Sequence, residues 1–140
     1  MSGTSGVARF INSSVIVRYL TDDDPRRSRV AERIIESDAL VVTAVILSEV
    51  AYVLRTTYNY PRSEIVDAVL EFVQRENVDV LDARKEFVGV ALDNARSGGL
   101  SFGDALILAQ MRSSGIRQIY SFDKDFRDPA IDVLEEPVAS

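Results

Sequence analysis

The stretch Ala39-Leu-Val-Val-Thr-Ala-Val-Ile-Leu-Ser-Glu-Val-Ala-Tyr-Val-Leu54 contains the two patterns that decide the fold. Its first part, Ala39 to Val42, is a short apolar run that predicts a buried strand. Thr43 can cap the helix that follows, which we expect to continue to about Arg55. A buried strand that leads directly into a helix is typical of a parallel sheet with helices on both faces.

The same alternation extends toward both ends of the chain. Further strands are predicted at Val7 to Ile11, Val78 to Leu81 and Gln118 to Tyr120, with a fifth candidate at Ile131 to Leu134. Helices are predicted at Ser14 to Leu20, from Asp24 and Pro25 to about Ser37, after Pro61, from Asp82 to Gly98 and Gly99, and from Ser101 to near Gly115. We therefore predict an α/β protein with a central parallel sheet. Residues 1–140 are expected to form one domain, with residues 1–6 as a flexible N-terminal tail.

The composition excludes several classes of chemistry. The 140 residues contain no cysteine and no histidine, which rules out disulfides, thiolate catalysis, sulfur-based zinc sites and Ser-His or Cys-His machinery. Any metal must be held by oxygen atoms of carboxylates, carbonyls and water, and these suit magnesium, manganese or calcium. Catalysis by this chain is thereby limited to hard-metal or purely carboxylate chemistry.

Charge and hydropathy limit the partners and the location. With 22 acidic and 16 basic residues, the net charge of −6 argues against a nucleic-acid binder held by a broad basic face. The same acidic total is compatible with an acidic metal pocket. No apolar run approaches the ~18 residues that cross a bilayer, and Met1 to Gly6 lacks the parts of a signal peptide. We expect a cytoplasmic protein that does not enter a membrane.

Glu49 is an unexpected residue on its helix. The residues three and four positions away are Val45, Ile46, Tyr52 and Val53. The carboxylate therefore lies on an apolar face, where it would lose hydration unless a cation compensates its charge. For this residue alone, an ion pair with Arg18 or Arg55 is as good an explanation as a functional role.

Asp104 presents a similar case in Ser101-Phe-Gly-Asp-Ala-Leu-Ile-Leu-Ala109. By helical spacing it faces Leu100, Ile107 and Leu108, which form an apolar side. Ser101 and Asp104 also stand three apart at a helix start, close to the capping-box pattern. A capping role and a functional role are both open at this position.

The remaining candidates follow predicted strands. Asp123 and Asp125 occur in Ser121-Phe-Asp-Lys-Asp-Phe126, and Asn12 follows the first strand. Such residues commonly form turns, so local structure explains each of them when it is taken singly. The charge run from Asp22 to Asp24 is interpreted as a solvated loop next to a helix cap.

Taken together, four of these positions predict a site. In open parallel sheets, ligands bind beyond the carboxyl ends of the strands. Asn12 and Asp123 are at strand ends, and the helices that carry Glu49 and Asp104 start on the same edge of the sheet. Three of the four side chains are anionic and none has a histidine partner. A divalent cation is the natural compensating charge.

The segments around these positions resemble the PIN-domain ribonucleases of the VapC toxin type. The opening motif of that family is similar to Phe10-Ile-Asn-Ser-Ser-Val-Ile-Val-Arg-Tyr-Leu20, and its later motifs are similar to Ser48-Glu49-Val50, Asp104-Ala-Leu-Ile107 and Ser121-Phe-Asp-Lys-Asp-Phe126. The resemblance covers nearly the whole chain. It implies a Rossmann-like α/β/α sandwich, one or two Mg²⁺ or Mn²⁺ ions, and endonucleolytic cleavage of RNA. It also implies a homodimer and a cognate antitoxin partner.

Carried over residue by residue, Glu49, Asp104 and Asp123 match the acidic positions of the family, and Ser121 and Asp125 are secondary members of the site. Asn12 occupies the place of the first aspartate. The resemblance implies that Asn12, Asp104 and Asp123 hold the metal, that Glu49 orients bound water or completes the coordination of the metal, and that a metal-activated water attacks a phosphodiester in line. Asn12 offers only a neutral carbonyl oxygen, a departure that points to impaired activity.

Two rival interpretations are kept. Asn12 also fits a PIN-fold binding module that no longer cuts RNA. Two origins of Asn12 fit equally well: natural decay of the site, or deliberate replacement of an aspartate to make a toxic nuclease tolerable to its expression host. A phosphate-transfer domain would use Asp123 and Asp125, which lie in the last fifth of the chain rather than near the first strand. The stretch from Arg18 through Arg33 joins a charged loop to an amphipathic helix that bears Val30, Ile34 and Ile35, and the helix after Pro61 carries another apolar stripe. Both stripes are candidate surfaces for the dimer or the antitoxin, with core packing as the alternative.

Overall fold

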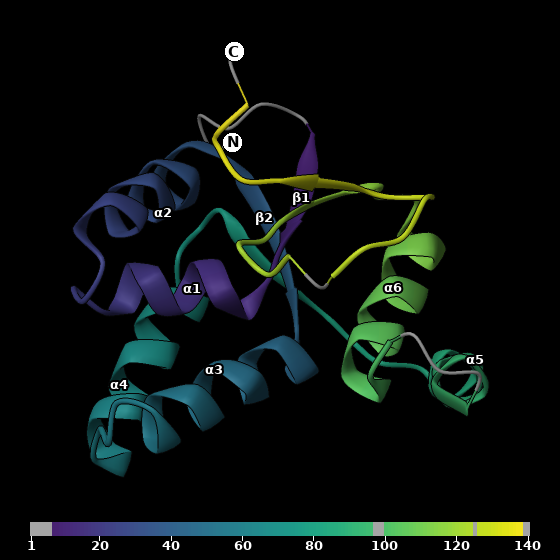
Figure 1. The fold of residues 1–140 in the computed structure, drawn as a ribbon, viewed down its shortest axis with the longest axis horizontal. Coiled ribbons are helices and arrows are strands. Elements are labelled where there is room, and N and C mark those ends of the chain that lie inside the picture. Colours follow the sequence, from purple (N-terminus) through teal and green to yellow (C-terminus); the bar gives the residue numbers. More distant parts are fainter. Residues whose placement is uncertain (1–6, 97–99, 125, 139–140) are drawn as a thin grey trace.

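The computed structural model describes residues 7–96, 100–124 and 126–138 (Figure 1). The strands are β1 (Ala8–Ile11), β2 (Ala39–Thr43), β3 (Val78–Leu81), β4 (Gln118–Tyr120) and β5 (Asp132–Leu134). The helices are α1 (Ser13–Leu20), α2 (Pro25–Ser37), α3 (Ala44–Thr56), α4 (Arg62–Val73), α5 (Lys85–Arg96) and α6 (Phe102–Ser114). The predicted tail at residues 1–6 and the predicted helix stop at Gly98 and Gly99 lie outside the described residues.

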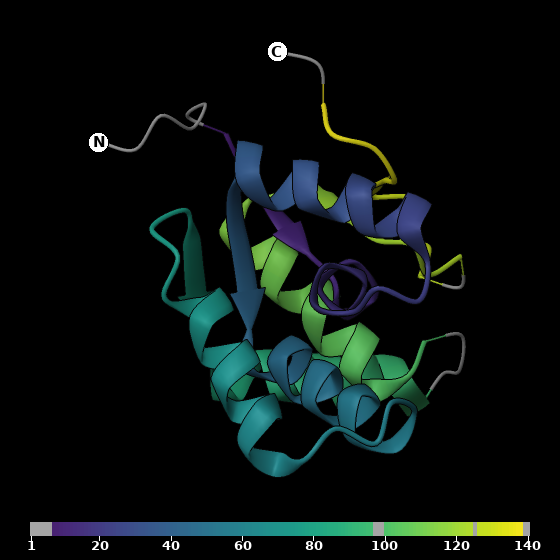
Figure 2. The same cartoon turned by 90° about the vertical axis from the view of Figure 1, so that its left-hand side faces the viewer.

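The strands form one sheet in the order β3-β2-β1-β4-β5, and every neighbouring pair is parallel. In Figure 1, α1 and α2 lie on one side of β1 and β2, and α5 and α6 lie on the other. Figure 2 shows α2 across the top of the sheet and α3 and α4 below α1. The predicted α/β sandwich with a central parallel sheet is confirmed. Because the chain continues to opposite sides of β1, the carboxyl ends of β1 and β4 border a crevice in which such folds bind ligands.

Three of the helix starts predicted from capping residues are confirmed. Asp24, Thr43 and Ser101 are the N-caps of α2, α3 and α6, and each side chain accepts a hydrogen bond from the backbone N–H three residues on, at 3.1, 3.3 and 3.2 Å. Gly115 ends α6 with a left-handed φ of 77°, which glycine adopts without steric cost. The bounds of β1, α1 and β5 differ from the predicted ones by a single residue.

The start of α5 was predicted wrongly. The helix begins at Lys85, and the carbonyl of Arg84 accepts hydrogen bonds from the N–H groups of Phe87 and Val88. The carbonyl of Asp82 instead accepts from Nε2 of Gln110 in α6, at 3.2 Å. This contact ties the segment before α5 to α6, so Asp82 does not cap the helix.

The apolar stripe of α2 is core and not a docking surface. Val30, Ile34 and Ile35 are 7%, 0% and 0% exposed, which corrects their candidacy for an interface with a partner. On α4, by contrast, Val66 and Leu70 are 55% and 49% exposed. The helix after Pro61 therefore keeps part of its apolar surface available to solvent.

A buried polar cluster that the sequence did not predict links β1 and β4 to Asp38, the residue between α2 and β2. Nη1 of Arg9 lies 3.2 Å from Oδ2 of Asp38, and the Tyr120 hydroxyl donates a hydrogen bond to the same oxygen. Burial, followed by this hydrogen bond, raises the pKa of Tyr120 to about 12. Its hydroxyl therefore stays protonated and serves as a structural donor.

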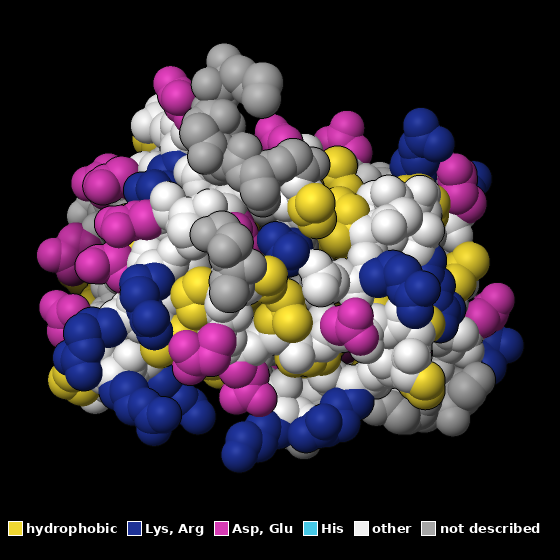
Figure 3. All heavy atoms as spheres, turned by 90° about the horizontal axis from the view of Figure 1, so that it is seen from above, with side chains coloured by type: hydrophobic (Ala, Val, Ile, Leu, Met, Phe, Trp, Pro, Cys, Tyr) yellow, Lys and Arg dark blue, Asp and Glu magenta, His cyan; other side chains and the backbone are white. Residues whose placement is uncertain are grey.

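On the surface seen from above, Lys and Arg side chains are interspersed with Asp and Glu and do not form one broad basic face (Figure 3). This mixture agrees with the net charge of −6. Within the ranges that the structure describes, no helix combines the length and the apolar character needed to cross a membrane.

Candidate active site

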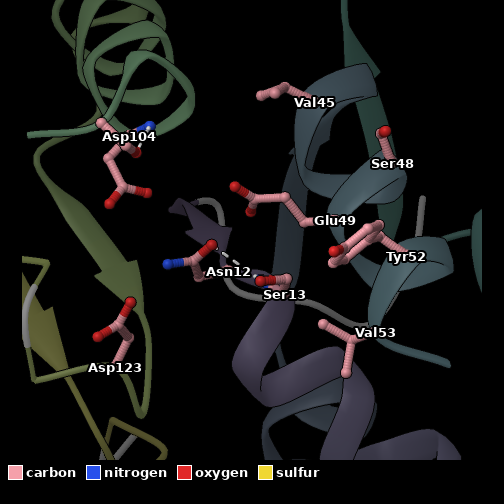
Figure 4. A pocket seen from close by; sticks show the side chains of 10 residues that line it. Asn12, Ser13, Val45, Ser48, Glu49, Tyr52, Val53, Asp104 and Asp123 are labelled. Atoms are coloured by element: carbon pink, nitrogen blue, oxygen red, sulfur yellow. Dashed lines mark hydrogen bonds between the residues drawn. The ribbon is translucent and has the colours of Figure 1, made fainter. Parts of the chain in front are cut away.

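Asn12, Glu49, Asp104 and Asp123 all line one pocket of about 450 Å³ (Figure 4). Asn12 directly follows β1, and Asp123 lies in the loop after β4. Asp104 is in the first turn of α6, and Glu49 is one turn further into α3. The structure thus brings together the four side chains that the sequence predicted to converge, at the carboxyl edge of the sheet.

The side chain of Asn12 is buried, and both its oxygen and its nitrogen make hydrogen bonds within the protein. Its Oδ1 accepts a hydrogen bond from the backbone N–H of Ser13 at 2.8 Å and so caps α1, while its Nδ2 donates to Oγ of Ser121 at 3.3 Å. Figure 4 shows the amide nitrogen directed toward the side of the pocket where Asp104 and Asp123 lie. An NH₂ group cannot ligate a cation. An aspartate in the same rotamer would place a second oxygen there.

Two serine hydroxyls fix the loop after β4 against α1. Oγ of Ser121 accepts from the backbone N–H of Asp123 at 3.0 Å and lies 3.3 Å from Oγ of Ser14. Oγ of Ser14 accepts from the N–H of Phe122 at 2.9 Å. Ser121 was predicted as a secondary member of the site, whereas Ser14 was missed. Asp125, the other predicted secondary member, lies outside the described residues.

The carboxyl groups of Glu49 and Asp104 resist ionisation. Burial raises the pKa of Glu49, the charges of Asp104 and Asp123 add to this effect, and a hydrogen bond with Ser13 opposes it. Burial and the charge of Asp123 likewise raise the pKa of Asp104, against a hydrogen bond with Ser101. These shifts are those expected when like charges share a poorly hydrated space.

The alternative of a structural ion pair for Glu49 is wrong. Arg18 pairs with Asp23 at 2.9 Å, and the guanidinium of Arg55 lies over the ring of Tyr52, 5.6 Å from its centroid. Within the part of the chain that the structure describes, Glu49 has no Lys or Arg partner. Asp104 takes part in both the helix start and the pocket. Its backbone N–H donates to Oγ of Ser101, and its side chain lines the pocket.

The run from Asp22 to Asp24 lies in the loop between α1 and α2, where Asp22 and Asp23 are exposed as predicted, and Asp23 also makes several hydrogen bonds. Asp23 accepts hydrogen bonds from the Tyr58 hydroxyl at 2.7 Å, from Arg18 at 2.9 Å and from the Thr21 hydroxyl at 3.1 Å. The hydrogen bond from Tyr58 is the main cause of a lowered pKa at Asp23. This cluster joins the end of α1 to the loop after α3 and stays outside the pocket.

Gly103 makes room for the Glu49 carboxylate. A Cβ atom at this position would lie 3.1 Å from Oε2 of Glu49, closer than an ordinary contact. In the sequence this glycine is part of the segment Ser101 to Ala109, and nothing local to it indicates this role. Ser13, Ser48 and Tyr52 also line the pocket without having been predicted. For Tyr52 the signal was present, since it lies one helical turn after Glu49.

Three helices begin beside the pocket. Its lining includes Ser13 at the start of α1, Val45 at the start of α3 and Ser101 at the N-cap of α6. Helix N-termini carry partial positive charge and unpaired N–H groups, which favour anions such as phosphate. The pocket therefore offers carboxylates for a cation and helix ends for an anion.

The donor set fits a hydrated hard cation. The lining residues include three carboxylates and, among the described residues, neither Lys nor Arg. Within the same ranges, no three carboxylates lie close enough to chelate one ion directly. Magnesium keeps several waters and is usually bound through one or two carboxylates, so this spacing is compatible with it. Asp104 and Asp123 could hold such an ion, with Glu49 bonded to its water.

A parallel sheet covered by helices, with an acidic pocket at its topological switch point, defines a Rossmann-like α/β protein. The family model of the PIN domain matches residues 9–132, and the chain belongs to the PIN-domain family. A comparison with curated protein sequences gave no match.

Solved structures share the fold. VapC20 from Mycobacterium tuberculosis, a sarcin-ricin loop cleaving toxin, is 23% identical with a TM-score of 0.71, covering 84% of this chain and 91% of its own. VapBC2 from Rickettsia felis, bound to a fragment of promoter DNA, is 13% identical with a TM-score of 0.65, covering 91% and 98%. A toxin-antitoxin complex from Klebsiella pneumoniae is 12% identical with a TM-score of 0.60, covering 89% and 95%.

Proposed function

We propose that this protein is a metal-dependent endoribonuclease, the toxin of a toxin-antitoxin pair, whose activity is impaired by Asn12. The observation that carries the proposal is the convergence of Glu49, Asp104 and Asp123 in one pocket of a PIN-family chain. Support also comes from the similar proteins, one of which is a toxin that cleaves the sarcin-ricin loop and another a toxin-antitoxin complex.

Different residues of the pocket would have different roles in RNA cleavage. When bound, Mg²⁺ or Mn²⁺ supplies an activated water and neutralises charge on the phosphodiester. Asp104 and Asp123 would hold the ion. Glu49, which lines the same pocket, would orient the attacking water and take its proton. The N-termini of α1, α3 and α6 favour a bound phosphate.

Asn12 weakens this arrangement. Its oxygen caps α1 and its NH₂ group donates to Ser121, so the side chain supplies no anionic ligand. Magnesium depends on carboxylates to offset its loss of hydration. We therefore expect weak metal binding and slow cleavage in the chain as written.

A second candidate function follows from the same residue. Oδ1 and Nδ2 of Asn12 each make a hydrogen bond within the protein, which suits a binding module that needs no metal and no longer cuts RNA. In that case only the partner-binding surface would be functional. The predicted homodimer, the cognate antitoxin and a cytoplasmic location belong to the toxin proposal and rest on the family resemblance.

RNA cleavage by the Asn12→Asp variant tests the proposal. Single-stranded RNA would be incubated with the variant and manganese, with EDTA as one control and the Asn12→Asp, Asp123→Asn double variant as another. We expect cleavage at least about tenfold faster than with the unchanged chain, and abolished in both controls. Equal absence of cleavage in Asn12→Asp and the unchanged chain would favour the binding module.

A further inference from the structure

The pocket has two unlike walls. Asp104 and Asp123 line one side, while α3 contributes Val45, Tyr52 and Val53 to the other, with Glu49 between them (Figure 4). A cation and a phosphate need only the acidic wall and the helix ends. The apolar wall fits a ligand that also carries a flat, weakly polar group.

Tyr52 is the most prominent part of that wall. It is 61% exposed, although a tyrosine ring is a large apolar surface that is usually more buried. It lies three residues after Glu49, and Figure 4 shows its ring beside the Glu49 side chain at the pocket. An exposed ring at the edge of this acidic pocket is suited to stack on a ligand.

Arg55 extends the same surface. Its guanidinium lies over the Tyr52 ring, 5.6 Å from the centroid, one turn further along α3. This cation–π contact covers one face of the Tyr52 ring. The Arg55 guanidinium is itself exposed and can contact a phosphate. Ring and guanidinium thus form a platform with an aromatic part near the pocket and a positive part further out.

We propose that Tyr52 stacks on a nucleobase of single-stranded RNA next to the phosphate held in the pocket, with Arg55 contacting the neighbouring backbone. This inference rests on the proposed function, because it deepens the ligand class of the same pocket. Proteins that bind single strands combine stacked aromatic side chains with cationic contacts to the backbone. In this chain Tyr52 lies within one turn of Glu49, and Arg55 follows one turn further along α3.

Binding of short RNAs tests the stacking directly. The probes are single-stranded RNA octamers with 2-aminopurine placed at each position in turn, mixed with the intact protein and magnesium. Stacking on Tyr52 should quench the fluorescence strongly at one position. Tyr52→Phe should keep both the quenching and the affinity, because it keeps the aromatic face.

Tyr52→Leu provides the decisive comparison. Leucine keeps an apolar side chain but has no ring, so affinity should fall about 5- to 150-fold and the quenching should disappear. The same octamer with an abasic site at the quenched position should bind equally to the unchanged chain and to Tyr52→Leu. Leu70→Ala, at a position 49% exposed on α4 and outside the pocket lining, is the matched control and should change neither quantity.

The outcomes separate this inference from the proposed function. Octamers that bind equally well to Tyr52→Leu and the unchanged chain would overturn the stacking and leave Tyr52 to a protein partner. Octamers that do not bind at all would overturn the stacking, and cleavage of RNA by Asn12→Asp would then decide the nuclease separately. If Tyr52→Leu weakens binding while Asn12→Asp fails to cleave RNA, the base contact stands and the nuclease does not.

Discussion

Glu49 and Asp104 carry negative charge in a half-buried pocket, and this has a consequence for stability. The folded protein holds protons on these groups at higher pH than the unfolded chain does. Their charges therefore destabilise the metal-free fold at neutral pH, and this penalty disappears as the pH falls through the raised pKa values toward the ordinary carboxyl range.

Substitution of Glu49 tests this coupling. In the absence of metal, Glu49→Gln should raise the free energy of unfolding at pH 7, by less than about 1 kcal/mol because water screens half-exposed charges. It should also reduce the gain in stability that the unchanged chain shows between pH 7 and pH 5. Urea denaturation at both pH values measures this. A loss of stability at pH 7 would mean that the carboxylate is compensated by a partner.

Ser121 should matter more for the fold than its small side chain suggests. Its buried hydroxyl accepts hydrogen bonds from Asn12 and from the N–H of Asp123. Ser121→Ala would leave these donors unpaired, at a cost of about 1–3 kcal/mol in the free energy of unfolding. Urea denaturation is the measurement, with the exposed Ser63→Ala as control. A cost equal to that of the control would show that water replaces the hydroxyl.

At the scale of elements, α6 combines a helix start with a part of the site. Gly103 gives the helix an unfavourable residue and leaves space for Oε2 of Glu49, 3.1 Å from where a Cβ would lie. We predict that Gly103→Ala raises the free energy of unfolding by up to about 1 kcal/mol and displaces the Glu49 carboxylate.

Thermal melting and RNA cleavage in the Asn12→Asp background measure the two effects of Gly103→Ala. The expected result is an equal or higher Tm together with slower cleavage. As a control, Gly89→Ala in α5, where an added Cβ meets nothing within 4 Å, should stabilise the helix and leave cleavage unchanged. Equal cleavage in the Gly103→Ala and Gly89→Ala variants would show that the space beside Glu49 is not needed.

The sequence predicted most elements because their signals are local. The side chains of Thr43 and Ser101 cap their helices by accepting hydrogen bonds from N–H groups three residues on. Gly115 ends α6 because its own backbone adopts a left-handed conformation. The signal at Asp82 failed because its carbonyl is bonded to Gln110, 28 residues away. Contacts between distant segments, such as those of Ser14 and Gly103, leave no periodic pattern in one sequence, and these were missed for that reason.

At the scale of the whole molecule, the order of strands explains why four distant residues meet. β1 lies between β2 and β4, so the loops and helices that follow these strands surround one crevice. The alternation of strands and helices was enough to predict that shared edge. It could not predict which way each side chain points, and Asn12 directs its NH₂ group where a ligand oxygen was expected.

The toxin proposal predicts association. We expect a homodimer in solution and a small antitoxin partner, whose basic side chain could occupy the anionic pocket. Light scattering of the isolated chain measures the first, and a monomer at tens of micromolar would count against it. Co-purification with the product of a neighbouring gene measures the second. Recovery of the chain alone from its native cells would favour a free-standing RNA-processing enzyme.

The most direct test of a metal site at these positions is a calorimetric titration with manganese. Asn12→Asp should bind Mn²⁺ at least about tenfold more tightly than the unchanged chain, because the new carboxylate adds an anionic oxygen beside Asp104 and Asp123. Adding Asp104→Asn to that variant should remove the gain. Equal affinity of Asn12→Asp and the unchanged chain would contradict the account, since position 12 would then lie outside any metal site.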